Sequence, residues 1–230
     1  MNNTKGTPPV WRTVLAIDHC PKACEVYRVA VLGETSGRVR DAFLRLGHNA
    51  TSYDLLPSDV PGPHVQGDYM DADLSGIDII IAHPSCTYLC NSGVRWLHTD
   101  PFRWEKMRTA ARHFRRVLEL PARIGIAVEN PIMHKYAVEI VGRRQDQVIQ
   151  PWQFGHGETK ATGLWLRGLP PLVPTNIVAG RDGRIHRMPP GPDRWKRRSE
   201  TYRGIADAMA AQWGRARDYH REHGERRAAS

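Results

Sequence analysis

Two short segments of the sequence hold the side chains with the clearest potential for chemistry. Cys86 ends the segment His83-Pro84-Ser85-Cys86, directly after an apolar run, and Glu129 and Asn130 follow a second apolar run. A thiolate can attack an electrophilic carbon, and a carboxyl group can deliver or accept a proton. A cysteine here can equally be half of a metal site or a buried apolar side chain. Which of these three interpretations holds for Cys86 depends on the side chains that the fold places next to it.

The cysteines form two Cys-x-x-x-Cys pairs, Cys20 with Cys24 and Cys86 with Cys90. Structural zinc sites mostly use Cys-x-x-Cys pairs, and a closed site of four thiolates would leave Cys86 unable to react. We therefore expect no metal and interpret Cys90 as a core residue or as a support for Cys86. Four cysteines in 230 residues also do not make a disulfide framework.

The hydrophobic pattern predicts elements that place these segments at one edge of a sheet. Apolar runs predict strands over 28–33, within 49–59, and over 77–85, 123–131 and 161–166. Helical spacing of apolar residues predicts helices over 34–48, 101–120 and 201–222. The first of these helices would bury Val39, Ala42, Phe43 and Leu46. The alternation predicts an α/β fold with an open, mostly parallel, doubly wound sheet that has helices on both faces.

The turn after the first strand is a candidate cofactor site. Gly33 and Gly37 bracket a turn that opens a helix, and Asp54 follows the second strand about 20 residues later. A carboxylate at that place either accepts hydrogen bonds from ribose hydroxyls or simply forms the turn. The Gly-Lys-Ser/Thr phosphate loop and the G-x-G-x-x-G motif are absent. The turn therefore favours a nucleoside-bearing ligand without a pyrophosphate, a description that S-adenosylmethionine fits.

The charge of the chain indicates a polyanionic partner. The 33 Lys and Arg residues outnumber the 24 Asp and Glu residues, which gives a net charge of +9. A Pro-, Gly- and Arg-rich segment over 167–200 contains many of them, and they either contact DNA phosphates or solubilise a loop. These residues are Arg181, Arg184, Arg187, Arg194, Lys196, Arg197 and Arg198.

Four regions follow from this pattern. They are an N-terminal extension (1–27), a catalytic core (28–166), a short irregular basic lobe that contacts DNA (167–200), and a C-terminal helix with a basic tail (201–230). We find no membrane-spanning run and no signal peptide in the sequence, so we expect a cytoplasmic protein.

Taken together and in this order, the motifs resemble those of the cytosine-C5 DNA methyltransferases, especially the compact branch carried by phages and prophages. The segments that match the family are VAVLGETSGRVRDAFLRLGHNATSYDLLPSD, HVQGDYMD, HPSC, VENP and YRGIADAMAAQW. Those that resemble the compact branch are CTYLCNSGVRWL, ENPIMHKYA and QPWQFGHGETKATGLWLRGLPPLVPT. The resemblance implies a Rossmann-like fold that uses S-adenosylmethionine, in the host cytoplasm for a phage protein, with protection of DNA from restriction as the benefit.

The resemblance also implies a role for each matching residue. Cys86 would attack C6 of a cytosine that has left the DNA stack, and Glu129 would protonate N3. Asn130 and Pro131 would fix the loop of Glu129. The residues implied to bind the cofactor are Gly33, Glu34, Thr35, Ser36, Gly37, Arg38, Val39, Asp54, Leu55, Asp68 and Pro84.

The chain departs from the family pattern in three places. Its first turn lacks the aromatic-Ala-Gly-x-Gly sequence, and His83-Pro84-Ser85 precedes the nucleophile where a Pro-Pro-Cys or Pro-Cys-Gln run is usual. The Gln-x-Arg-x-Arg motif is not recognisable, which leaves Lys160 or Arg38 as its substitute. A large target-recognition domain is missing, so the lobe over 167–200 must serve. Two alternatives stay open: a non-catalytic DNA-binding protein on a decayed methyltransferase fold, and an enzyme that modifies pyrimidine nucleotides or adds another one-carbon group.

Overall fold

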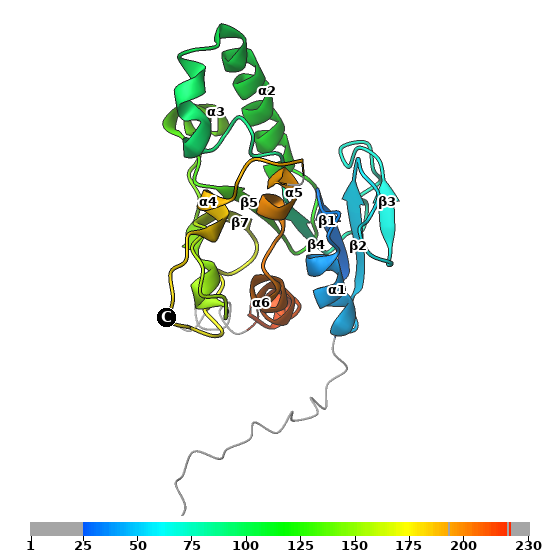
Figure 1. Cartoon of the computed structure of the whole chain (residues 1–230). Coiled ribbons are helices and arrows are strands. Elements are labelled where there is room, and N and C mark those ends of the chain that lie inside the picture. Colours follow the sequence, from blue (N-terminus) through cyan, green and yellow to red (C-terminus); the bar gives the residue numbers. More distant parts are fainter. Residues whose placement is uncertain (1–24, 193, 220, 222–230) are drawn as a thin grey trace, which may run out of the picture.

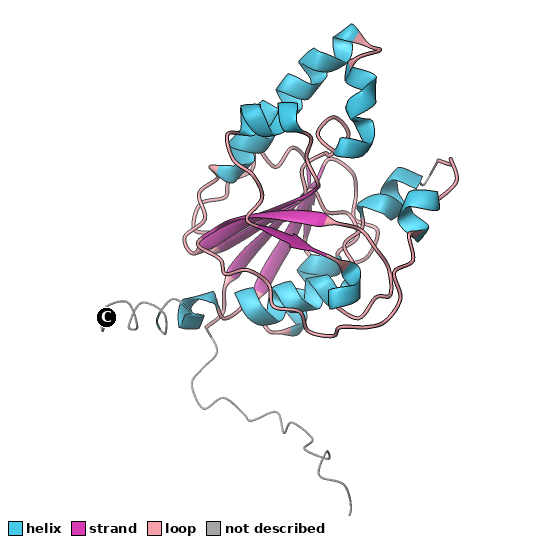
Figure 2. Ribbon diagram, turned by 90° about the vertical axis from the view of Figure 1, so that its left-hand side faces the viewer, coloured by secondary structure: helices cyan, strands magenta, loops and turns pink. Residues whose placement is uncertain are grey.

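The described residues form three layers, with one seven-stranded sheet between two layers of helices (Figures 1 and 2). The structure is a computed structural model that describes residues 25–192, 194–219 and 221. The strand order is β3-β2-β1-β4-β5-β7-β6. The strands are β1 (Arg28–Leu32), β2 (Asn49–Asp54), β3 (His64–Gln66), β4 (Ile79–Ala82), β5 (Gly125–Pro131), β6 (Gln147–Ile149) and β7 (Thr162–Arg167). The expected doubly wound α/β fold, Rossmann-like and mostly parallel, is confirmed.

The register of the central strands decides which residues leave the sheet together. Strands β1 to β5 are parallel, and Ala82 of β4 pairs with Leu32 of β1 and with Val128 of β5. Gly33, His83 and Glu129 each follow one of these partners, so they emerge side by side at the carboxyl edge. The strand order reverses between β1 and β4, which is where ligands bind in sheets of this kind.

Four helices cover the two faces of the sheet (Figure 1). Helices α1 (Arg38–Arg45) and α6 (Arg203–Trp213) pack on one face, and α2 (Pro101–Leu118) and α3 (Lys135–Val141) pack on the other. The apolar stripe of α6 is buried as predicted from its spacing. Helix α2 begins where Asp100 caps it and Pro101 fills the first position, because a proline there loses no hydrogen bond.

Several elements differ from the sequence expectation. Strand β7 is antiparallel to both of its neighbours, and β3, β6 and α3 were not predicted. Leu46 is 53% exposed because α1 ends at Arg45, so the prediction that it lines the buried stripe is wrong. Helix α6 ends at Trp213, earlier than expected, because Gly214 stands at its C-cap.

The basic lobe lies beyond the carboxyl edge of the sheet. It contains two short helices, α4 (Arg184–Arg187) and α5 (Arg194–Ser199), which stand past the strand arrowheads in Figure 2. An ion pair of Lys196 with Asp59 and another of Arg38 with Glu200 at 2.5 Å connect this lobe to the turns of the sheet edge. In the described part of the chain, no helix is both long and apolar enough to cross a bilayer.

Candidate active site

The turn after β1 is built around Gly33. Its φ of +73° is in the left-handed region, and a Cβ at this position would lie 2.5 Å from the carbonyl oxygen of His83. The backbone N–H of Gly33 donates to Tyr53 at 2.7 Å, and that of His83 donates to Leu32 at 2.8 Å. The candidate cofactor turn and the segment before Cys86 are therefore in direct backbone contact, which only a glycine at position 33 permits.

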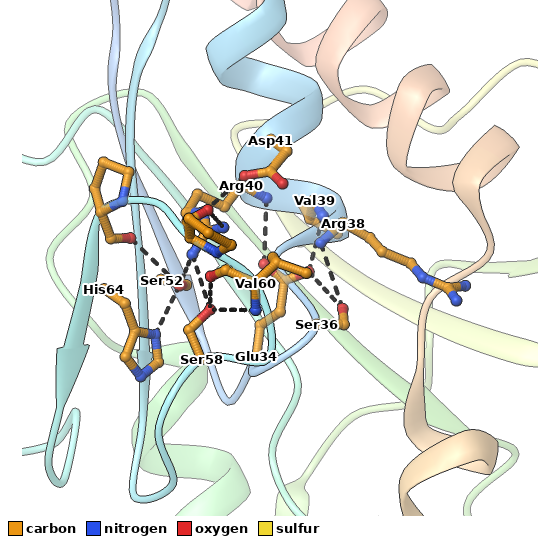
Figure 3. A network of polar contacts seen from close by, with 12 residues as sticks. Glu34, Ser36, Arg38, Val39, Arg40, Asp41, Ser52, Ser58, Val60 and His64 are labelled. Atoms are coloured by element: carbon orange, nitrogen blue, oxygen red, sulfur yellow. Dashed lines mark hydrogen bonds and ion pairs between the residues drawn. The ribbon is translucent and has the colours of Figure 1, made fainter.

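The carboxylate of Glu34 caps helix α1 (Figure 3). Its two oxygens accept the N–H groups of Val39 at 2.8 Å and Arg40 at 3.2 Å, and the side chain of Ser36 also donates to it. The N–H of Asp41 bonds to Gly37, so the first turn of α1 keeps few free donors. Because Glu34 occupies the place where a pyrophosphate binds in dinucleotide folds, the turn suits a ligand without one.

A buried arginine organises the loop beside this turn. Arg40 is fully buried, and its guanidinium bonds to Ser52, Ser58 and the carbonyl of Pro61 (Figure 3). Thr35 bonds to Asp59 in the same loop at 2.9 Å. Sequence reasoning did not find Arg40, because an arginine in an amphipathic helix is normally exposed.

The other residues expected to bind the cofactor lie along the same edge. Asp54 at the end of β2 accepts the N–H of Leu56 at 2.9 Å, and Asp68 accepts that of Met70 at 2.9 Å. Both bonds are turn-forming bonds, and for Asp54 this is the alternative that the sequence left open. Leu55 is exposed, and Pro84 is buried next to His83.

The loop that carries Cys86 is attached to the loop after β5. Cys90 and Met133 form an isolated antiparallel bridge, and the N–H of Asn91 donates to Ile132 at 3.0 Å. Nδ1 of His134 accepts the N–H of Ala137 at 3.2 Å, so Nε2 carries the proton and donates to the carbonyl of Tyr88 at 3.0 Å. These bonds fix the position of Cys86 relative to the segment with Glu129.

The thiols of Cys86 and Cys90 are hydrogen-bonded to each other. The bond from Cys86 lowers the pKa of Cys90 to about 5, against burial and with help from Ser92 and Gly93. The same bond, together with burial, raises the pKa of Cys86, whereas the charge of Lys160 acts to lower it. The pair therefore holds one negative charge more readily than two.

Glu129 belongs to a buried charge cluster with His83 and Lys160. Nδ1 of His83 lies 3.3 Å from Oε2 of Glu129, and Thr201 also donates to that oxygen at 3.4 Å. Burial acts to raise the pKa of Glu129, but the bond and charge of His83 and the charge of Lys160 outweigh it and lower the pKa. Lys160 is 9% exposed and donates to the carbonyl of Glu200 at 3.1 Å, and burial lowers its pKa.

Two side chains at this edge have unpaired polar atoms. Both side-chain atoms of Asn130 and Nε2 of His83 are buried without a hydrogen-bond partner among the described residues. Leaving a buried polar group unpaired costs roughly 1–3 kcal/mol. Asn130 lies near the carboxyl end of β5 and His83 directly follows β4, so their positions fit a polar ligand at the carboxyl edge.

The basic residues that we expected to contact DNA differ in their surroundings. Lys160, which we also considered as a DNA contact, is buried in this structure, and Arg184 and Arg187 are paired with Glu158 and Asp182. Arg194 donates to the carbonyl of Met188 at 2.8 Å. Arg197 is exposed and Arg198 is half-buried, next to the ion-paired Lys196.

The zinc alternative depends on residues that the structure does not describe. Cys20 and Cys24 lie outside the described residues. Within the described ranges, no group of three or more His, Cys, Asp or Glu side chains is arranged to hold a metal ion.

Comparison with known proteins gives likenesses at the level of structure. No family profile matches the chain, and no curated protein matches it. Entamoeba histolytica methyltransferase EhMeth aligns at 14% identity over 67% of this chain and 58% of its own, with a TM-score of 0.43. S. pombe Dnmt2 methyltransferase aligns at 14% identity over 64% of this chain and 51% of its own, with a TM-score of 0.40. Methyltransferase CalO6 aligns at 11% identity over 61% of this chain and 56% of its own, with a TM-score of 0.34. The chain spans just over half the length of each of them.

Proposed function

We propose that this chain is an S-adenosylmethionine-dependent methyltransferase that methylates C5 of cytosine in DNA. The observation that carries the proposal is the placement of Cys86 after β4 and of Glu129 near the carboxyl end of the adjacent parallel strand β5, with Lys160 acting electrostatically on both. A thiol nucleophile and a proton donor then stand at the place where α/β sheets bind their ligands.

The residues at the switch point fit the cofactor. The Gly33 turn, the capped start of α1 and Asp54 at the end of β2 offer a site for a nucleoside without a pyrophosphate. The unpaired polar atoms of Asn130 and His83 are available for polar groups of the ligands. When bound, S-adenosylmethionine supplies an electrophilic methyl group.

The side chains of the chain then have distinct tasks. Cys86 must lose its proton before its sulfur adds to C6 of the base, and the positive charge of Lys160 favours the thiolate. The addition makes C5 nucleophilic and draws electrons toward N3, where Glu129 delivers a proton. After methyl transfer, loss of the C5 proton to a base allows the C6–sulfur bond to break, and Cys86 is regenerated.

Lys160 is our candidate for the function of the missing arginine motif. Its ammonium group is buried and acts electrostatically on the thiol and the carboxyl, whereas Arg38 is one-third exposed and paired with Glu200. A buried cation near Cys86 and Glu129 can hold both in their charged forms.

DNA is the proposed partner because the basic lobe lies over the same edge of the sheet (Figure 2). Arg197 and Arg198 on α5 follow the exposed Trp195, a combination that suits phosphate contacts and base stacking. Methylation of this kind would mask DNA from restriction nucleases.

The test uses the purified full-length chain, labelled S-adenosylmethionine and duplex DNA. We expect label in 5-methylcytosine, no turnover by Cys86→Ser, and a covalent adduct with DNA that contains 5-fluorocytosine only when Cys86 is present. Cofactor binding without any modified base in DNA would reject the proposal. DNA binding without cofactor binding would select the non-catalytic alternative, and mass spectrometry of the nucleosides would reveal a different one-carbon group.

A further inference from the structure

His83 lies at the carboxyl edge of the sheet, and the proposed methylation reaction gives its side chain no role in catalysis. It precedes Pro84 and Ser85 in the segment that leads to Cys86, and it is fixed by backbone contacts with both Leu32 and Gly33. Its side chain is 13% exposed and that of Glu129 is 10% exposed, and Nδ1 and Oε2 lie 3.3 Å apart. Two titratable groups are thus held together in a place with little solvent.

We propose that His83 supplies the proton that Glu129 delivers to N3 of the cytosine. This inference rests on the proposed function and adds a positioning residue to it. It answers a difficulty in the geometry: a glutamate that is held as a carboxylate has no proton to give. An imidazolium at hydrogen-bond distance can provide one without contact with bulk water.

The charges around His83 favour its protonated form. Burial acts to lower its pKa, but the bond to Glu129 and the charges of Glu129 and Glu34 outweigh burial and the opposing charge of Lys160, so the pKa is raised. Lys160 is a weaker candidate for the donor because its ammonium group is bonded to the carbonyl of Glu200. Of these two cationic groups, His83 is the one that contacts the carboxylate, where the hydroxyl of Thr201 also donates to the same oxygen.

The proton balance of the step is simple. As the thiolate adds to C6, the Nδ1–H bond of His83 breaks and an O–H bond forms on Glu129, while the carboxyl proton passes to N3. When Cys86 leaves, N3 loses this proton to Glu129 and His83 recovers it. The proton from C5 leaves to a separate base, so the His83–Glu129 pair ends each turnover as it began.

Nε2 of His83 supports the same assignment. It is buried without a partner among the described residues, and in the imidazolium form it carries a second N–H. A buried donor without an acceptor is costly, so we expect a ligand atom of the reaction complex to accept this bond.

The first test measures the pair directly, without turnover. Nitrogen NMR of the ring nitrogens of the full-length protein should give His83 a pKa above 6.5 that falls in Glu129→Gln. His134, whose two nitrogens are bonded to backbone groups, serves as the internal control and should not respond. A His83 that is neutral below pH 6.5, or unaffected by Glu129→Gln, would overturn the inference.

The second test is the pH profile of methylation. His83→Asn keeps a donor near Glu129 but cannot titrate, and we expect kcat to fall roughly 10²-fold with little change in KM. The alkaline limb should move to lower pH, because a carboxyl group alone holds its proton less tightly than an imidazole. If His83→Asn methylates DNA and the alkaline limb of its pH profile is unchanged, the role of His83 is rejected while the proposed function stands. A wild-type protein that methylates no DNA rejects the proposed function, while NMR still decides whether the two groups share a proton.

Discussion

Nε2 of His134 donates a hydrogen bond to the carbonyl of Tyr88 at 3.0 Å, while Nδ1 of the same ring caps helix α3 through Ala137. One imidazole thus joins the loop of Cys86 to the segment that follows Glu129. The bridge between Cys90 and Met133 adds a second connection between the same two loops. The distance between nucleophile and acid is therefore fixed by backbone contacts in addition to side-chain packing.

We expect His134→Ala to remove both bonds and to lower the free energy of unfolding by about 1–2 kcal/mol. His134→Asn is the matched control, because asparagine caps a helix well but is too short for Tyr88. Urea unfolding measures the loss of unfolding free energy. The rate of adduct formation with 5-fluorocytosine DNA reports whether the loop still positions Cys86 for attack. Equal adduct rates in the wild type and both variants would show that the bond to Tyr88 does not position Cys86.

The buried cap of α1 gives a second prediction. Glu34→Ala leaves the N–H groups of Val39 and Arg40 without their acceptors, so we expect a loss of about 1–2 kcal/mol in unfolding free energy. Ser36→Ala, which removes a longer bond to the same carboxylate, should cost less. Calorimetric titration with S-adenosylmethionine should show weaker binding by the Glu34 variant. If the two variants unfold at the same urea concentration, the cap is not the source of stability at this turn.

The positions of Cys86 and Glu129 at the sheet edge could be predicted from sequence, because each follows a continuous apolar run. Ile79–Ala82 and Gly125–Val128 are buried on both faces, and only a parallel sheet covered by helices buries strands in that way. The stripe of α6 was predictable for the same reason, since helical spacing reports burial directly.

Other features depend on contacts that local patterns do not contain. The direction of β7 is invisible to periodicity, and β3 and β6 are three residues long, too short to give a pattern. The burial of Arg40 requires the loop over 58–61 to close upon it. The pairing of His83 with Glu129 joins positions 46 residues apart (129 − 83), and it became visible only when adjacent strands were in register.

Gly33 and Gly47 allow a third prediction with a built-in control. Both have positive φ, but a Cβ at Gly33 would strike the carbonyl of His83, whereas nothing lies within 4 Å of one at Gly47. Gly47→Ala should cost about 1–2 kcal/mol for its backbone conformation. Gly33→Ala should cost about 1–3 kcal/mol more because of the clash. Chemical denaturation compares them, and equal losses would mean that the contact with His83 is not tight.

The thiol pair gives a prediction about pH. The pKa of Cys90 is lowered to about 5, so its alkylation by iodoacetamide should begin in mildly acidic solution. The bond to Cys90 is the main cause of the raised pKa of Cys86. Cys90→Ala removes it, so the onset of Cys86 alkylation should move to lower pH. Mass spectrometry of the labelled peptides measures both onsets, and an unmoved onset for Cys86 would mean that the thiols are not coupled.

Lys160 and Arg38 were equal candidates for the missing arginine motif, and thiol chemistry can separate them. The charge of Lys160 acts to lower the pKa of Cys86, so Lys160→Met should move the alkylation of Cys86 to higher pH, opposite in sign to Cys90→Ala. Arg38→Met removes a half-buried pair with Glu200 and should leave the alkylation profile unchanged. Lys160→Met should still fold, because replacing a buried charge by an apolar side chain of similar length is often neutral for stability. A shift of equal size in both variants would assign the effect to the general positive charge at this edge of the sheet and would reject a selective action of Lys160 on Cys86.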